Sequence, residues 1–128
     1  MRLLLDTHVL LWAAGQPKRL APRLRRLLER PESELLFSAA SLWEAVIKRG
    51  LGRDDFQVDV RELRRGLLGN EYHELPVSGE HALALDALPP LHKDPFDRIL
   101  VAQCLVEGVT LVTADPLLAR YPIAVELI

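Results

Sequence analysis

The stretch RLLLDTHVLLWAAG, residues 2–15, shows the pattern on which the fold is built. Its first residues, 2–5, predict a short buried strand, which Asp6 closes. A helical pattern follows over residues 9–14 and ends at Gly15. A strand, an acidic residue and a helix therefore follow one another directly.

Short apolar runs and helical patterns alternate along the rest of the chain, and glycine or proline ends several of them. A parallel strand pair needs a crossover connection, which is usually helical, so this alternation predicts an α/β fold with a parallel sheet covered on both faces. Further strands are predicted at residues 35–37, 72–75, 109–112 and 124–127, and helices at residues 22–30, 38–50, 59–68, 78–85 and 95–107, with a short helix after Asp115.

The composition indicates a single globular domain, residues 1–128, with 49% hydrophobic and 27% charged residues. Cys104 is the only cysteine, and no Cys/His set has zinc-finger spacing, so we expect a reducing cytosol and no structural zinc. The apolar amino-terminal run is interrupted by Asp6 and is shorter than the about 18 uncharged residues of a membrane span. Neither a signal peptide nor a span is expected.

The net charge is −2, but it is unevenly distributed. Residues 1–30 carry seven basic and two acidic side chains, a net +5, which leaves −7 for the remainder. Bulk charge alone does not indicate a nucleic-acid partner, whereas a polarised molecule can present a basic surface beside an acidic one.

Asp6 and Asp115 each follow a strand and precede a helix, so either could simply be a helix N-cap. The stretch HKDPFDRILVAQC, residues 92–104, places Asp94 as the cap of the next helix. Asp97 then stands at the third helical position, where the helix dipole favours a carboxylate. One aspartate starts this helix, and the other is free for another role.

Glu44 has two local explanations. Ser41 and Glu44 match a capping box, and Glu44 with Lys48 matches an exposed i, i+4 ion pair. Ser38 is the better cap because it follows the strand directly, which places Glu44 in the second turn, at the edge of an apolar face. Glu44 could therefore reach a cleft.

Ligands of such sheets bind beyond the carboxyl ends of the strands. Three of the candidate acids stand there, namely Asp6, Asp97 and Asp115, and Glu44 is the fourth candidate. Carboxylates that converge within about 4 Å repel by up to ~4 kcal/mol a pair at an effective dielectric of 20, so protons or a cation must relieve them. Carboxylate oxygens suit Mg²⁺ or Mn²⁺. The predicted site is a metal-assisted phosphoryl-transfer site, in which the metal activates water and stabilises the leaving oxygen.

Four blocks of the chain, in order, resemble the PIN-domain ribonucleases, specifically the VapC toxins of prokaryotic toxin–antitoxin pairs. The blocks are LLLDTHVLLW at residues 3–12, SAASLWEAVIK at 38–48, HKDPFDRILVAQC at 92–104 and LVTAD at 111–115. The resemblance implies a three-layer α/β/α sandwich and Mg²⁺- or Mn²⁺-dependent endonucleolytic cleavage of RNA, which leaves 5′-phosphate and 3′-hydroxyl ends. It also implies a homodimer and a cognate antitoxin whose tail occupies the acidic groove.

Carried onto this sequence, the catalytic and metal-binding quartet of the family is Asp6, Glu44, Asp97 and Asp115. The resemblance assigns supporting roles to Thr7 and Thr113, as hydroxyls that position a carboxylate or water, and to Arg98, which would neutralise phosphate or brace the acids. Asp94 either joins this group or only caps its helix. Cys104 departs from the small residue usual at its position, a change of packing.

The remaining features have ordinary alternatives. The arginine-rich helix between Lys18 and Arg30 is either a solvated face or a contact for the RNA backbone, through Arg19, Arg23 and Arg26. Trp12 and Trp43 are expected in the core or at a dimer contact. The histidines lack metal-binding spacing and are expected at the surface or in loops, with His8 and His92 near the mouth of the cleft; the others are His73 and His81.

Two other classes of function remain open at this stage. A phosphoacceptor receiver domain has a similar length, a parallel sheet and an acidic Mg²⁺ pocket, but it needs paired acids after the first strand, where this chain has Asp6, Thr7 and His8. A non-catalytic binding module would use the acids only as helix caps.

Overall fold

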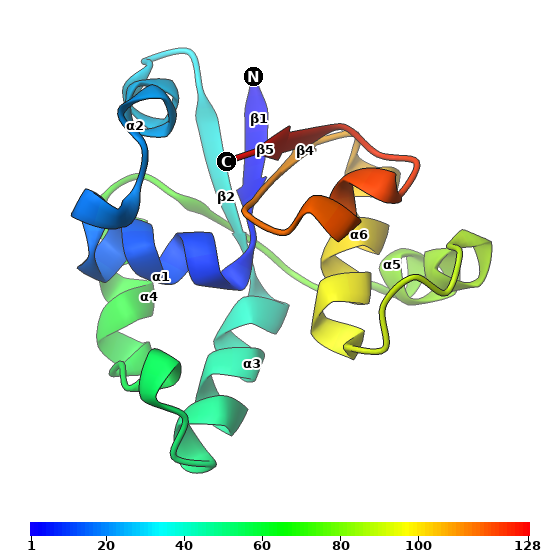
Figure 1. The fold of residues 1–128 in the computed structure, drawn as a ribbon, viewed down its shortest axis with the longest axis horizontal. Coiled ribbons are helices and arrows are strands. Elements are labelled where there is room, and N and C mark those ends of the chain that lie inside the picture. The colour runs from blue at the N-terminus through cyan, green and yellow to red at the C-terminus, as the bar shows by residue number, and fades with distance from the viewer.

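In the computed structural model, which describes residues 1–128, five strands form one parallel sheet in the order β3-β2-β1-β4-β5 (Figure 1). The central strand β1 pairs with β2 on one side and with β4 on the other. The predicted α/β fold with a central parallel sheet is confirmed. The strands are β1 (Arg2–Leu5), β2 (Glu34–Ser38), β3 (His73–Leu75), β4 (Thr110–Thr113) and β5 (Val125–Leu127).

Helices connect the strands, and none of them has the length and apolar character needed to cross a lipid bilayer. The α-helices are α1 (Thr7–Gly15), α2 (Pro22–Glu29), α3 (Ala39–Gly50), α4 (Val60–Gly69), α5 (Gly79–Ala84) and α6 (Pro95–Glu107). The short 3-10 helices are η1 (Pro17–Arg19), η2 (Asp54–Phe56), η3 (Leu85–Ala87) and η4 (Pro116–Arg120).

The alternation of side chains along β1 divides the core into two layers. Leu3 and Leu5 pack with buried residues of α1, α2 and α4, whereas Leu4 packs with buried residues of α6 and η4. Figure 1 shows α1, α2 and α4 on one side of the sheet and α5 and α6 on the other. All three leucines are fully buried. The sheet is therefore apolar on both faces, and the candidate polar residues lie at the carboxyl ends of its strands.

The strand order indicates where on the sheet a ligand site is expected. The chain moves from β1 to β2 and β3 on one side and then crosses to β4 and β5 on the other, so the order reverses between β1 and β4. Asp6 follows β1 at this point, and its backbone N–H donates to the Val112 carbonyl of β4 (2.9 Å). Crevices at such reversals are where α/β sheets bind ligands.

Local structure departs from the predictions in two places. The first helix begins at Thr7 rather than at residue 9, because the Asp6 carboxylate accepts the Val9 N–H and caps the helix at once. The helix after Asp115 is a single 3-10 segment, η4.

Trp43 is 62% exposed, which excludes the core and leaves the expected dimer contact open. One surface expectation was wrong. His81 is buried rather than at the surface: its Nδ1 accepts the Ser78 N–H, and its Nε2 lies 2.8 Å from a Glu107 carboxylate oxygen.

Candidate functional site

Asp6 and Thr113 form the floor of the site, between β1 and β4. Asp6 is 9% exposed; its Oδ1 accepts the Val9 N–H (3.0 Å), and its Oδ2 accepts the Thr113 hydroxyl. Burial raises the pKa of Asp6, although the hydrogen bonds from Thr113 and Val9 oppose the increase. The Thr113 oxygen also accepts the Asp115 N–H (3.0 Å). One hydroxyl thus ties two of the predicted acids together.

Asp115 follows β4 and caps η4 through the Leu117 N–H, which its Oδ1 accepts (2.9 Å). Its Oδ2 lies 3.0 Å from Nε2 of His92. Burial would raise the pKa of Asp115, but the hydrogen bonds from His92 and from the Leu117 N–H outweigh burial and lower it. Asp115 is therefore held as a carboxylate.

Asp97 stands in the first turn of α6, which Asp94 caps by accepting the Phe96 N–H (2.8 Å). Burial first, then the charges of Asp94, Glu44 and Asp6, raise the pKa of Asp97 to about 6, and only His92 opposes them. Asp97 is the acid whose charge is least compensated by the protein.

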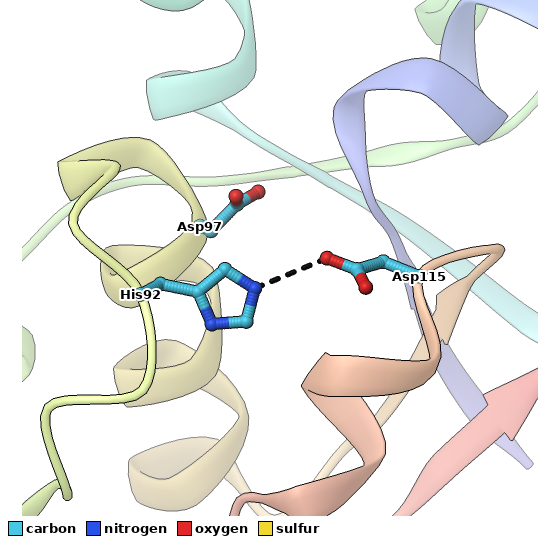
Figure 2. Close-up of side chains that lie close together, drawn as sticks. All are labelled: His92, Asp97 and Asp115. Atoms are coloured by element: carbon cyan, nitrogen blue, oxygen red, sulfur yellow. Dashed lines mark hydrogen bonds and ion pairs between the residues drawn. The ribbon is translucent and has the colours of Figure 1, made fainter.

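The side chains of His92, Asp97 and Asp115 face one another from three different segments (Figure 2). One potential ligand atom from each lies within 4.8 Å of the others, a spacing that one metal ion could span. Two of the three are predicted acids. The third, His92, was expected near the mouth of the cleft but not among the residues that could bind a metal.

Glu44 lies on α3 and is buried, and Lys48 Nζ donates to its Oε2. Ser38 caps α3 as predicted, by accepting the Ala40 N–H (3.0 Å). The i, i+4 ion pair also forms, but it is buried rather than exposed: the side chains are 5% and 17% exposed. Lys48 Nζ also lies 3.6 Å from Asp94. Glu44 therefore lies at the site with the Lys48 ammonium group hydrogen-bonded to it.

Two of the predicted supporting residues make other contacts. The Thr7 hydroxyl donates to Ser41 Oγ (2.9 Å), which joins α1 to α3, and it contacts no carboxylate. The Arg98 guanidinium donates to the carbonyls of Pro89 (2.9 Å) and Leu85 (3.3 Å). Arg98 in this structure braces the segment that leads into α6 rather than the acids.

Lys48 lies beside Glu44 and Tyr121 beside His92, and neither of these two was predicted at the site. The lysine was visible only as an ion-pair partner of Glu44. The histidine has no ligand spacing because its partners, Asp97 and Asp115, are brought to it by the fold. A weak signal existed for His92, since it directly precedes the segment that carries two aspartates.

The predicted RNA-binding arginines lie on η1 and α2. Arg19 stacks on the Trp12 ring (4.6 Å to the centroid), and Arg23 pairs with Glu126 (3.0 Å) and donates to the Leu127 carbonyl (3.1 Å). Arg26 is exposed. Leu127 is in register with Thr113, so Arg23 stands near the same edge of the sheet as the acids.

A groove of about 1070 Å³ runs beside α1, α2 and α4. Its walls combine apolar residues such as Leu20 and Leu63 with charged ones such as Arg25 and Asp55, and His8 also lines it. His8 Nε2 is 3.1 Å from Asp55, so this histidine faces the groove rather than the acids.

Comparison with known proteins identifies the family. The PIN domain family model matches residues 3–124. No curated protein matches the chain. The structure is similar to VapBC2 from Rickettsia felis bound to a DNA fragment from their promoter, with a TM-score of 0.72 and 18% identity over 99% of this chain and 98% of that one. VapBC-1 from nontypeable Haemophilus influenzae gives 0.63 and 18% over 99% and 98%, and a toxin-antitoxin complex from Klebsiella pneumoniae gives 0.56 and 17% over 88% and 86%. Because the family model spans nearly the whole length, the chain belongs to the PIN domain family.

Proposed function

We propose that this chain is a Mg²⁺- or Mn²⁺-dependent endoribonuclease and the toxin component of a toxin–antitoxin pair. The observation that carries the proposal is the meeting of Asp6, Asp97 and Asp115 at the strand reversal, where burial and neighbouring acids raise the pKa of Asp97 to about 6. Membership of the PIN domain family and the likeness to VapBC and to a toxin-antitoxin complex support it.

The residues present fit a hard divalent cation. The donor set is dominated by carboxylate oxygens, which Mg²⁺ and Mn²⁺ prefer, and a cation beside Asp97 would supply the positive charge that its surroundings lack. Asp6, Asp97 and Asp115 would hold the ion. Glu44 would join them through Oε1, since Lys48 occupies Oε2.

The protein itself fixes where those oxygens lie. Thr113 orients Asp6 and the start of the Asp115 segment, and the caps of α1 and η4 fix one oxygen of each carboxylate. When bound, the ion would act as a Lewis acid toward the scissile phosphate and would increase the acidity of the attacking water. Lys48, beside Glu44 and Asp94, would offset the charge of an approaching phosphate. The products would carry 5′-phosphate and 3′-hydroxyl ends.

Partners belong to the same proposal. RNA would approach over Arg19, Arg23 and Arg26, whose charge opposes that of the acidic edge. The antitoxin would place its tail over the acids, and the groove beside α1, α2 and α4 offers a neighbouring surface for the rest of it. A homodimer would cover the exposed apolar residues of α3, which include Trp43 and Val46.

The test is cleavage of an RNA of defined sequence by purified protein with Mn²⁺, beside an Asp6→Asn variant. Asparagine can still accept the Val9 N–H and cap α1, so this variant keeps its fold while losing the charge. Cleavage that requires Mn²⁺ and is lost in the variant supports the proposal.

Other outcomes would contradict it. RNA binding without cleavage would indicate a non-catalytic module, and aspartyl phosphorylation by a small phosphodonor would indicate a receiver. Equal cleavage by both proteins would indicate a contaminating nuclease.

A further inference from the structure

His92 is linked to Asp115 on one side and to Tyr121 on the other. Its side chain is 8% exposed. The ring Nε2 lies 3.0 Å from Asp115 Oδ2, and Nδ1 lies 3.2 Å from the Tyr121 hydroxyl. Figure 2 shows the imidazole beside Asp97, pointing at the Asp115 carboxylate.

The hydrogen-bond partners determine which ring nitrogen carries the proton. A carboxylate only accepts, so Nε2 must donate to Asp115. In a neutral ring Nδ1 is then an acceptor, and the Tyr121 hydroxyl donates to it. The same hydroxyl oxygen accepts the backbone N–H of His92 (3.1 Å), so the Tyr121 hydroxyl is both a donor and an acceptor toward His92.

Tyr121 is a rigid support for this contact. The residue is 3% exposed, it ends η4, and its ring stacks on the imidazole at an interplanar angle of 26°. Ring stacking and two hydrogen bonds together leave His92 with one orientation.

Asp115 needs such an anchor. Its side chain is 43% exposed, and the cap of η4 engages only Oδ1. The other oxygen, Oδ2, receives its hydrogen bond from His92. Without His92, the outer half of this carboxylate would be free to turn toward solvent.

We propose that His92 is a positioning residue, which Tyr121 locks in the Nε2–H form and which aims Asp115 into the cation site. The inference rests on the proposed function, because it assigns His92 a role toward the same ion. It differs from direct coordination, in which Nε2 would have to give up its proton and its bond to Asp115.

The experiment measures Mn²⁺ affinity by calorimetry in the wild type, His92→Ala, His92→Gln and Tyr121→Phe, with His73→Ala as the control. His73 is exposed and makes no side-chain hydrogen bond. Loss of an outer support of a metal ligand typically weakens binding about 10- to 100-fold. We expect about a tenfold loss in His92→Ala, a smaller loss in Tyr121→Phe, and near wild-type affinity in His92→Gln, whose amide can still donate to Asp115.

Pulsed electron paramagnetic resonance of the bound Mn²⁺ separates positioning from coordination. Positioning predicts no directly bound nitrogen in the wild type; a coordinated imidazole nitrogen would overturn the proposal. Unchanged Mn²⁺ affinity in folded His92→Ala would also overturn the positioning role of His92, but it would not contradict the proposed nuclease function. A wild type that binds no Mn²⁺ would refute the proposed function, and with it this inference.

Discussion

Replacing Lys48 with methionine tests how much the Lys48 ammonium contributes to stability beside the buried Glu44 side chain. Methionine keeps most of the hydrocarbon chain, which lies near Phe56 and Phe96, and removes the ammonium. The Glu44 and Lys48 side chains are only 5% and 17% exposed, so the carboxylate would be left buried without its partner. Removing one partner of a buried ion pair typically costs about 3–5 kcal/mol.

The expected loss lies at or below the lower end of that range, because the Lys48 side chain is partly exposed and solvent screens the charge that is left behind. We therefore expect Lys48→Met to lose about 2–3 kcal/mol of unfolding free energy at pH 7.

Urea unfolding at pH 7 measures this loss, with Lys93→Met as the control because Lys93 is exposed and forms no ion pair. A loss below about 1 kcal/mol would refute the reasoning.

Three further predictions concern the acids and the arginines. Burial raises the pKa of Asp97 to about 6, above its unfolded value, so its ionisation costs stability as the pH rises from about 4 to 6. Asp97 is only partly buried, so solvent screening reduces this cost, and Asp97→Asn should be more stable than the wild type by about 1–2 kcal/mol at pH 8 and equal to it at pH 3. An unchanged difference in urea melts at both pH values would contradict this prediction. Mn²⁺ must displace that proton, so calorimetry should show tighter binding at pH 7.5 than at pH 5, and pH-independent affinity would argue against Asp97 as a ligand. Arg26→Ala should weaken RNA binding and reduce its salt dependence by about one counterion, whereas an unaltered slope would place the RNA elsewhere.

The order and type of the elements could be predicted because the signals are local. Asp6, Ser38 and Asp94 stand at the junctions where they cap helices, and Gly108 ends α6 with φ of 67°, a conformation that glycine adopts without strain. Boundaries shifted where a cap started a helix earlier than its apolar pattern, as at Thr7.

The site could be predicted only in part. Three of the acids were visible because Asp6 and Asp115 stand at strand ends and Asp97 in a first turn. Glu44 lies in the second turn of α3 and was indicated only by its place at the edge of an apolar face. The contacts that bring His92 to Asp115 span 23 positions of the chain and depend on how the segment before α6 passes η4, which no local pattern encodes. The burial of Lys48 was equally hidden, because an i, i+4 pair has the same spacing on an exposed and on a buried helix face.

The strand order also bears on when this site can exist during synthesis. Asp6 follows β1, but its hydroxyl partner, Thr113, belongs to β4, which comes after β2 and β3 along the chain and pairs with β1 on the side opposite β2. A ribosome-bound chain that ends before β4 cannot join Asp6 to Thr113, however well the preceding part has folded. The cleavage activity that we propose would therefore begin only after β4 has emerged, at a time when an inhibitor made beforehand could already be present.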